Sequence, residues 1–186
     1  MDVEEQLKKL FSNKTVVTNL QHRFTRVKKN EHALEDIYDG QIYKKFAKDP
    51  HLLENPNNYS YIFNTDGCQT SFNSKVTVWP IYLMINELPY YLRKKHMILA
   101  GLWVAKTEPD MAFFLTPFVD TANRLSSQGF VWNLNGIEVT SKIFPLGCCF
   151  DSLCRCAMLN MKQFNGYNGC TYCNYPGERV TKKQHL

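Results

Sequence analysis

Features that direct a chain out of the cell or into a membrane are missing from this sequence. It opens with the charged, amphipathic stretch MDVEEQLKKLFSNK and so lacks the apolar core of a secretory signal. No run approaches the roughly 20 apolar residues that a membrane-spanning helix needs. Internal repeats and low-complexity tracts are also absent. These absences predict a soluble intracellular protein, in the nucleus or the cytoplasm, with no membrane partner.

The cysteines and the charge narrow the class of protein further. Seven cysteines, an odd number without a secretory signal, favour reduced thiols or metal ligands over a disulfide framework. The 186 residues are 44% hydrophobic, which is enough for one core. A net charge of +5 is mildly basic and is compatible with an acidic partner such as nucleic acid.

Residues 1–54 form the first part of the predicted organisation, a helical and basic leader. An amphipathic helix at the start of the chain is predicted from four apolar residues at helical spacing: Val3, Leu7, Leu10 and Phe11. Residues 22–32 are a basic connector, and residues 34–49 predict a short helical pair broken by an Asp-Gly dipeptide. Residues 54–58 have the composition of a loop.

After this loop the pattern changes to strands. Residues 59–64, YSYIFN, are rich in aromatic and β-branched residues, and residues 74–86 form a second strand candidate. Pro80 marks the second strand as an edge strand or as the site of a bulge. Residues 97–105, MILAGLWVA, are almost wholly apolar, which predicts a strand buried on both faces.

A helix and a hairpin are predicted next. Residues 109–129 carry an apolar stripe at helical spacing and end in a glycine, a good helix stop. Pro117 either kinks this helix or stands at its first position, with Thr116 as the N-cap. The dipeptide Asn135-Gly136 then predicts a hairpin turn that leads into a further strand.

The order of these elements brings two aspartates together. Three strands can form an antiparallel meander, and the helix then allows a fourth strand to lie parallel beside the first. Asp66 ends the first strand and Asp151 ends the fourth, so both carboxylates are expected at one edge of the sheet. Neighbouring carboxylates repel unless a cation lies between them, and Mg²⁺ prefers such oxygen ligands. The alternative for Asp66 is ordinary turn chemistry, since Asp-Gly is a common turn dipeptide.

Several blocks of the sequence point to a known family. The blocks are YIFNTDG, TVWPIYLMINELP, MILAGLW, PDMAFFLTPFVD and LNMKQFNGYNGCTYCNYPGE, and a looser match begins earlier, near DIYDGQIYKKF. In this order they resemble transposases of cut-and-paste DNA transposons of the CACTA (En/Spm) type. The ordered set is a specific signal.

The resemblance implies an RNase H-like catalytic fold in which three acidic residues bind Mg²⁺ or Mn²⁺ and the enzyme acts on DNA. By resemblance Asp66 is the first acid and Asp151 the second, so both are expected to be catalytic and metal-binding. The expected fold class is α/β, an RNase H-like mixed sheet with helices, incomplete at the C-terminus and preceded by the short helical leader. Residues 55–186 would form the N-terminal portion of this core, with a Cys-x-x-Cys tail.

Two departures from the family pattern shape the functional expectation. Where the family has Asp-Leu-Pro-Ala-Arg-Ala after the second acid, only Asp151 and Arg155 match here. The family's third acid lies downstream of the last residue in this sequence, so a fragment or a remnant is expected. The expectation is a transposon-derived protein that is inactive as this fragment. The alternative is a domesticated, non-catalytic DNA- or protein-binding module.

Cys170 and Cys173 have the spacing of half a zinc site, which needs four ligands. Further ligands could come from His185 or from the cysteines that flank Asp151: Cys148, Cys149, Cys154 and Cys156. The alternative for the pair is two free thiols in a loop. The four flanking cysteines are better explained as buried core residues.

Three basic clusters could contact the phosphates of DNA: Arg23-Arg26-Lys28-Lys29, Arg93-Lys94-Lys95 and Lys182-Lys183. Arg93, Lys94 and Lys95 are the predicted DNA-binding residues, although charge runs are commonly just solvated faces. The tryptophans are expected in the core, because each lies in an apolar strand candidate: Trp79, Trp103 and Trp132. Besides DNA, a second copy of the chain is an expected partner.

Overall fold

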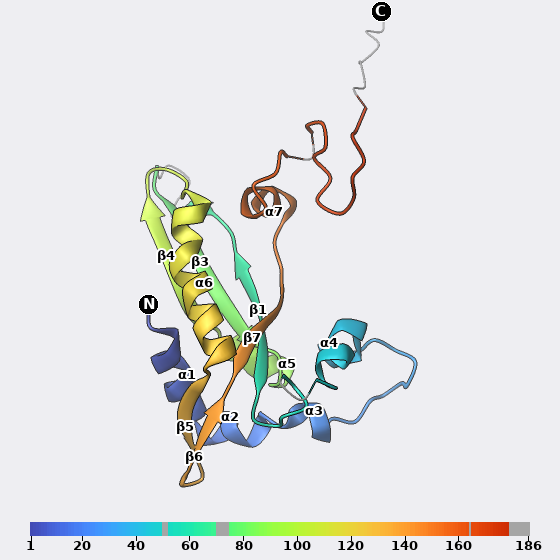
Figure 1. Ribbon diagram of the computed structural model, residues 1–186, viewed down its shortest axis with the longest axis vertical. Coiled ribbons are helices and arrows are strands. Elements are labelled where there is room, and N and C mark those ends of the chain that lie inside the picture. The colour runs from blue at the N-terminus through green and yellow to red at the C-terminus, as the bar shows by residue number, and fades with distance from the viewer. Residues whose placement is uncertain (50–51, 70–74, 164, 179–186) are drawn as a thin grey trace, which may run out of the picture. The chain divides into compact units, whose positions relative to one another are not determined.

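The computed structural model of the protein describes residues 1–49, 52–69, 75–163 and 165–178 (Figure 1). The chain divides into two compact units, residues 1–149 and residues 150–186. The boundary between the units lies after Cys149, and the predicted leader, residues 1–54, is part of the first unit. The first unit combines a mixed sheet with helices, so the fold class is mixed α/β as predicted.

The leader begins with α1 (Val3–Phe11), which packs into the core of the first unit. Asp2 caps this helix by accepting a hydrogen bond from the backbone N–H of Glu5. The helix buries the four residues predicted to share one face: Val3, Leu7, Leu10 and Phe11. Phe11 also contacts three aromatic rings from later strands: Tyr59, Phe130 and Trp132. The first helix is therefore held by the strands that follow it in the sequence.

The rest of the leader contains α2 (Lys14–Asn19), α3 (His22–Thr25), η1 (Ile37–Asp39) and α4 (Gln41–Phe46). The break between η1 and α4 at Gly40 confirms the predicted helical pair interrupted by an Asp-Gly dipeptide. This pair contributes to a buried cluster that fixes the leader to the sheet: Tyr38, Tyr43, Leu53 and Phe144.

The main sheet contains β1 (Tyr59–Thr65), β2 (Cys68–Gln69), β3 (Thr77–Ile85), β4 (Ile98–Ala105) and β7 (Ile143–Cys148). β1 and β4 both pair antiparallel with β3, and β7 pairs parallel with β1. The order across the sheet is therefore β4–β3–β1–β7, and β2 also pairs with β3. The predicted meander with a fourth strand parallel to the first is confirmed.

Two helices connect these strands. α5 (Tyr90–Lys95) joins β3 to β4, and α6 (Met111–Ser127) leads from β4 toward β7 and packs on the sheet (Figure 1). α6 begins after Asp110, whose side chain accepts a backbone N–H from the first turn, and Pro117 lies inside it. The alternative start with Thr116 as the N-cap is therefore wrong, because an earlier residue caps the helix.

A hairpin of β5 (Phe130–Leu134) and β6 (Ile137–Ser141) forms a separate two-stranded sheet. Asn135 and Gly136 have φ values of 53° and 92°, the left-handed conformations that a type I′ hairpin turn needs. Gly129 also has a positive φ, 77°, where the chain leaves α6. The sequence-based predictions of a helix stop and a hairpin turn are both confirmed.

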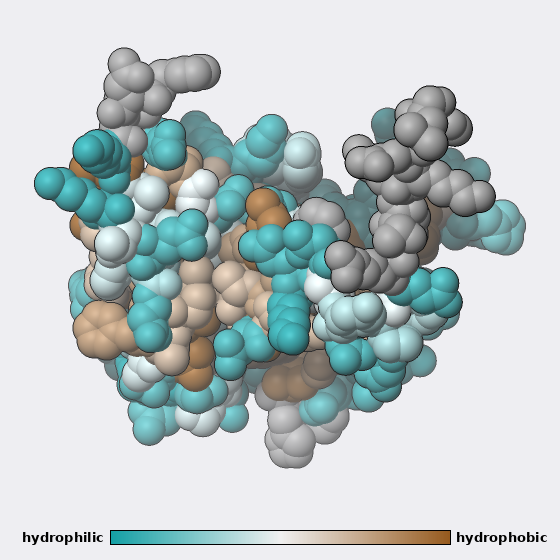
Figure 2. Space-filling model, turned by 90° about the horizontal axis from the view of Figure 1, so that it is seen from above, coloured by the Kyte–Doolittle hydropathy of each residue, from teal (hydrophilic) through white to brown (hydrophobic). Residues whose placement is uncertain are grey.

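One half of β4 is open to solvent. Leu102 and Val104 are 46% and 57% exposed, although residues 97–105 were predicted to be buried on both faces. That prediction is wrong for this half, because Leu102 and Val104 share one open face of the strand, whereas the alternating residues Trp103 and Ala105 are half-buried. Figure 2 shows apolar side chains reaching the molecular surface between hydrophilic ones.

The second unit contains α7 (Ser152–Met158), followed by loops at residues 159–163 and 165–178. α7 buries Cys154 and Cys156. Across both units, no helix in the part of the chain that the structure describes has the length and apolar character to cross a bilayer.

Candidate functional site

Asp66 does not lie in a tight turn. It stands with Gly67 between β1 and β2, and both strands pair with β3 in one continuous register, Thr65 opposite Ile81 and Cys68 opposite Val78. The two residues therefore interrupt a strand that continues in the same direction. The turn alternative for this dipeptide is wrong, because the chain passes straight through it.

Pro80 explains why the strand is interrupted at this point. The register places Pro80 opposite Asp66, and proline has no backbone N–H to donate to the ladder. β3 lies between β1 and β4, so the expectation of an edge strand is wrong for Pro80. The alternative of a bulge fits better, since the pairing of β3 with β4 shifts register between Ile81 and Tyr82.

Gly67 fixes the backbone beside Asp66 through a close contact with Trp79. A Cβ atom added to Gly67 would lie 2.5 Å from the Trp79 indole, so only glycine fits without movement. Trp79 is 7% exposed, and within the described residues its Nε1 atom has no hydrogen-bond partner. Thr65 on the other side of Asp66 is fully buried, whereas Asp66 itself is exposed. The result is a solvent-facing carboxylate on a firmly packed backbone.

The fourth strand ends beside the same part of β1. β7 runs parallel to β1 with Phe63 opposite Cys148, and the backbone N–H of Cys149 donates to the Phe63 carbonyl at 3.0 Å. The Asn64 side chain donates to the Cys149 carbonyl at 2.5 Å. The prediction that the strands preceding the two aspartates are parallel neighbours is therefore confirmed.

Asp151 belongs to the second unit, where it is the N-cap of α7. Its Oδ1 atom accepts a hydrogen bond from the backbone N–H of Cys154 at 2.6 Å, and its side chain is exposed. Asp66 belongs to the first unit. The approach of the two carboxylates to each other stays a prediction.

The cysteine pair also lies in the second unit. The Sγ atoms of Cys170 and Cys173 are 3.2 Å apart. The backbone N–H of Tyr172, and then the thiol and backbone N–H of Cys173, lower the pKa of the Cys170 thiol. These contacts favour a thiolate, the form that binds metal. Zinc binding by this pair stays a prediction.

The remaining zinc ligands are not assembled in the described residues. Across residues 1–49, 52–69, 75–163 and 165–178, no three histidine, cysteine, aspartate or glutamate side chains are grouped to hold a metal ion. His185, a predicted further ligand, lies outside these residues. Cys154 and Cys156 are buried as expected, but Cys148 and Cys149 are exposed, so their interpretation as core residues is wrong.

The predicted DNA-binding cluster divides into one internal residue and two surface residues. Arg93 is 7% exposed, and its guanidinium donates two hydrogen bonds to the Asp36 carboxylate at 2.7 and 3.1 Å. Lys94 and Lys95 are exposed on α5. Contact with DNA therefore stays a prediction chiefly for the two lysines, because the arginine is occupied in joining α5 to the leader.

The basic connector also makes contacts inside the protein. The side chain of Arg23 is 4% exposed, and Arg26 and Lys28 form ion pairs with Asp39. These three basic residues are thus engaged in contacts within the first unit. Lys182 and Lys183 lie outside the described residues.

A buried carboxylate, Glu87, was not singled out in the sequence. It is completely buried and accepts hydrogen bonds from the Ser60 N–H at 2.7 Å, the Ser60 hydroxyl at 2.8 Å and the Tyr43 hydroxyl at 3.0 Å. Arg23 Nη1 lies 3.9 Å away. Burial raises the pKa of Glu87, while Ser60, Arg23 and Tyr43 act in the opposite direction. The available signal was a glutamate directly after an apolar strand, in the block MINELP.

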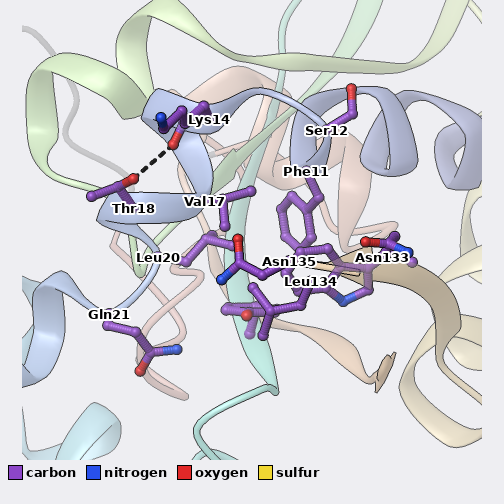
Figure 3. Close-up of a pocket in the computed structure, with 12 residues that line it drawn as sticks. Phe11, Ser12, Lys14, Val17, Thr18, Leu20, Gln21, Asn133, Leu134 and Asn135 are labelled. Atoms are coloured by element: carbon purple, nitrogen blue, oxygen red, sulfur yellow. Dashed lines mark hydrogen bonds between the residues drawn. The ribbon is translucent and has the colours of Figure 1, made fainter. Parts of the chain in front are cut away.

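The cavity in Figure 3 is separate from all of these residues. It has a volume of about 660 Å³ and lies between the α1–α2 region and the β5–β6 hairpin. Phe11, Val17 and Leu134 contribute apolar lining, and Lys14 contributes the one charged side chain among its lining residues. None of the predicted site residues lines it.

Comparison of the chain with protein-family models, with curated proteins and with solved structures found no match in any of the three.

Proposed function

We propose that this chain carries part of the RNase H-like catalytic core of a cut-and-paste DNA transposase of the CACTA (En/Spm) type. The observation that carries the proposal is the strand order β4–β3–β1–β7, in which β7 runs parallel to β1. Asp66 follows β1 directly, and Asp151 follows β7 within three residues of Cys148. Residues that follow the C-terminal ends of two neighbouring parallel strands lie at the same edge of a sheet. The proposed metal site needs two acidic residues at that edge.

Mg²⁺ or Mn²⁺ is the cofactor in this proposal, with Asp66 and Asp151 as ligands. Carboxylate oxygens are the donors that these hard ions prefer. Asp66 offers an exposed carboxylate, and Asp151 has Oδ2 to offer while Oδ1 caps α7. When bound, the ion would stabilise the charge that develops on a phosphoryl group.

DNA is the proposed partner, and Lys94 and Lys95 are the proposed phosphate contacts. Both side chains are exposed at the C-terminal end of α5. Arg93 has a positioning role, since its bidentate contact with Asp36 fixes this helix. Binding through two lysines is expected to weaken as salt rises and to be independent of DNA sequence.

We expect this 186-residue polypeptide to bind a divalent ion without cleaving DNA. Two-metal phosphoryl transfer holds its ions about 3.5–4 Å apart, which calls for more ligands than two carboxylates. A non-catalytic DNA- or protein-binding module is therefore the second candidate. Nicking of DNA in Mg²⁺ or Mn²⁺ that disappears in Asp66→Asn would contradict this expectation and would show that another acid completes the site.

The metal site can be tested by paramagnetic line broadening with Mn²⁺ in solution. We expect the amide signals of Thr65, Gly67 and Ser152 to broaden first, because they adjoin the two proposed ligands. Asp66→Asn should remove the broadening from both regions, since each carboxylate alone holds the ion weakly.

Glu138→Gln is the matched control, because Glu138 is an exposed carboxylate on the β5–β6 hairpin. This substitution should leave the broadening around Asp66 unchanged. Broadening that is equal around Glu138 and Asp66, or that survives Asp66→Asn, would argue against the proposed site.

A further inference from the structure

The thiols of Cys170 and Cys173 lie close together and are accessible to solvent. Cys170 and Cys173 hold their Sγ atoms 3.2 Å apart, roughly 1 Å longer than a disulfide bond. Cys173 is exposed and Cys170 is half-buried, so a small molecule can reach the pair. The two thiols are thus close to bonding distance and open to solvent.

Either sulfur of the pair can start a thiol–disulfide exchange. In such an exchange a thiolate attacks one disulfide sulfur, and a second thiol then resolves the mixed disulfide. Because the two Sγ atoms are 3.2 Å apart, whichever sulfur attacks has its resolving partner beside it.

Arg155 of α7 holds the loop between the two cysteines. Its Nη1 atom donates to the Thr171 hydroxyl at 3.3 Å, and its guanidinium carbon lies 4.6 Å from the centre of the Tyr172 ring. Arg155 also donates to the Phe150 carbonyl at 3.1 Å. Both residues that separate the sulfurs are thus contacted by one side chain, which limits how far the thiols can move apart.

We propose that Cys170 and Cys173 form a redox-active dithiol that low-molecular-weight disulfides, such as oxidised glutathione, convert to an intramolecular disulfide. One of the two thiols loses its proton to water, and its thiolate attacks one glutathione sulfur, which forms a mixed disulfide and releases one glutathione thiolate. The other thiol then loses its proton to water and attacks the protein sulfur of the mixed disulfide, which releases the second glutathione. The protein loses two electrons and two protons, and one glutathione disulfide becomes two thiols. Zinc on the same sulfurs would block this exchange.

The test uses the full chain, freed of metal with a chelator and equilibrated in buffers of reduced and oxidised glutathione. After an acid quench the thiols are alkylated, and the protein is cleaved with trypsin for mass spectrometry. Cleavage after Lys162 and Arg179 gives a peptide, residues 163–179, that contains Cys170 and Cys173 and no other cysteine. In the oxidising buffers we expect this peptide to carry neither an alkyl group nor glutathione, because its two sulfurs are joined in a disulfide.

Two single substitutions remove the resolving thiol in turn. Cys173→Ser should trap glutathione on Cys170, and Cys170→Ser should trap glutathione on Cys173. Neither variant should form the internal disulfide. The same oxidation in concentrated urea tests the contribution of the folded loop, and the folded chain should reach the disulfide at a lower proportion of oxidised glutathione.

Three results would overturn the proposal. The peptide could keep two alkylated thiols across the glutathione series, or it could carry glutathione on each cysteine without an internal disulfide. The folded chain could also oxidise no more readily than the chain in urea. The peptide would also keep two alkylated thiols if the protein retained one zinc per chain in the chelator. That outcome would overturn the proposal and would assign the pair to a metal site.

Discussion

The two ends of β1 lie beside acidic residues in opposite environments. At its beginning, Ser60 contacts Glu87, which is fully buried and receives three hydrogen bonds from side-chain and backbone donors. At its end, Asp66 is exposed, and the packing there is made by its neighbours Thr65 and Gly67. A carboxylate at the end of a strand can therefore serve the fold or face solvent.

The difference shows which of the two acids is free to act on a ligand. Glu87 is enclosed by donors from Ser60 and Tyr43 and lies near Arg23, so its oxygens are occupied in joining the leader to the sheet. Asp66 is held in place by its backbone, which leaves the carboxylate facing water. Substitutions at the two ends should accordingly affect folding very differently.

Glu87→Gln is expected to have the largest effect on the free energy of unfolding. The amide group would turn a donor toward a donor of Ser60 or Tyr43, so a buried hydrogen bond would be lost and a buried donor left unsatisfied. An unsatisfied buried donor costs up to about 3 kcal/mol. Urea unfolding followed by circular dichroism measures this loss, with the exposed Glu138→Gln as the matched control. A loss near zero would mean that Glu87 contributes nothing to the fold.

Gly67→Ala is expected to have an intermediate effect. The new Cβ atom would meet the Trp79 indole at 2.5 Å, and overpacking of this kind costs about 1–3 kcal/mol. Gly147→Ala is the control, because nothing lies within 4 Å of a Cβ atom built there. Adding Trp79→Phe to Gly67→Ala should cost less than the sum of the two single changes, since the smaller ring relieves the contact. Strict additivity in thermal unfolding would count against this explanation.

Asp66→Asn is expected to have the smallest effect on stability, within about 0.5 kcal/mol, because the side chain is exposed. The same substitution should abolish the Mn²⁺ broadening proposed for this residue. The substitution would then remove metal binding at Asp66 without a loss of stability. A loss of stability above about 1 kcal/mol would reveal a structural partner of the carboxylate and weaken the comparison with Glu87.

Local chemistry predicted much of the secondary structure. The apolar face of α1, the type I′ turn at Asn135-Gly136 and the helix stop at Gly129 follow from residues close together in the sequence. Pro117 was ambiguous because a proline can start or interrupt a helix, and the cap that decides the matter is Asp110. Local signals were thus reliable where one residue type has one dominant conformation.

The candidate site was predictable only in part. The positions of Asp66 and Asp151 after two parallel strands follow from the order of elements, and the pairing of β1 with β7 bears this out. Arg93 was grouped with its lysine neighbours by charge alone, because its partner Asp36 lies in a different part of the chain. Glu87 escaped notice for the same reason, since its donors come from Ser60 and Tyr43.

The amino-acid sequence by itself determined the elements, their order and the residues able to bind metal or exchange disulfides. Tertiary structure alone decided which charges are buried, that Asp66 interrupts a strand opposite Pro80, and that Arg155 holds the loop between Cys170 and Cys173. The physical reason is the distance along the sequence over which each interaction acts. Helix caps, turns and periodicity act over a few residues, whereas burial and ion pairing depend on groups that meet only after the chain has folded.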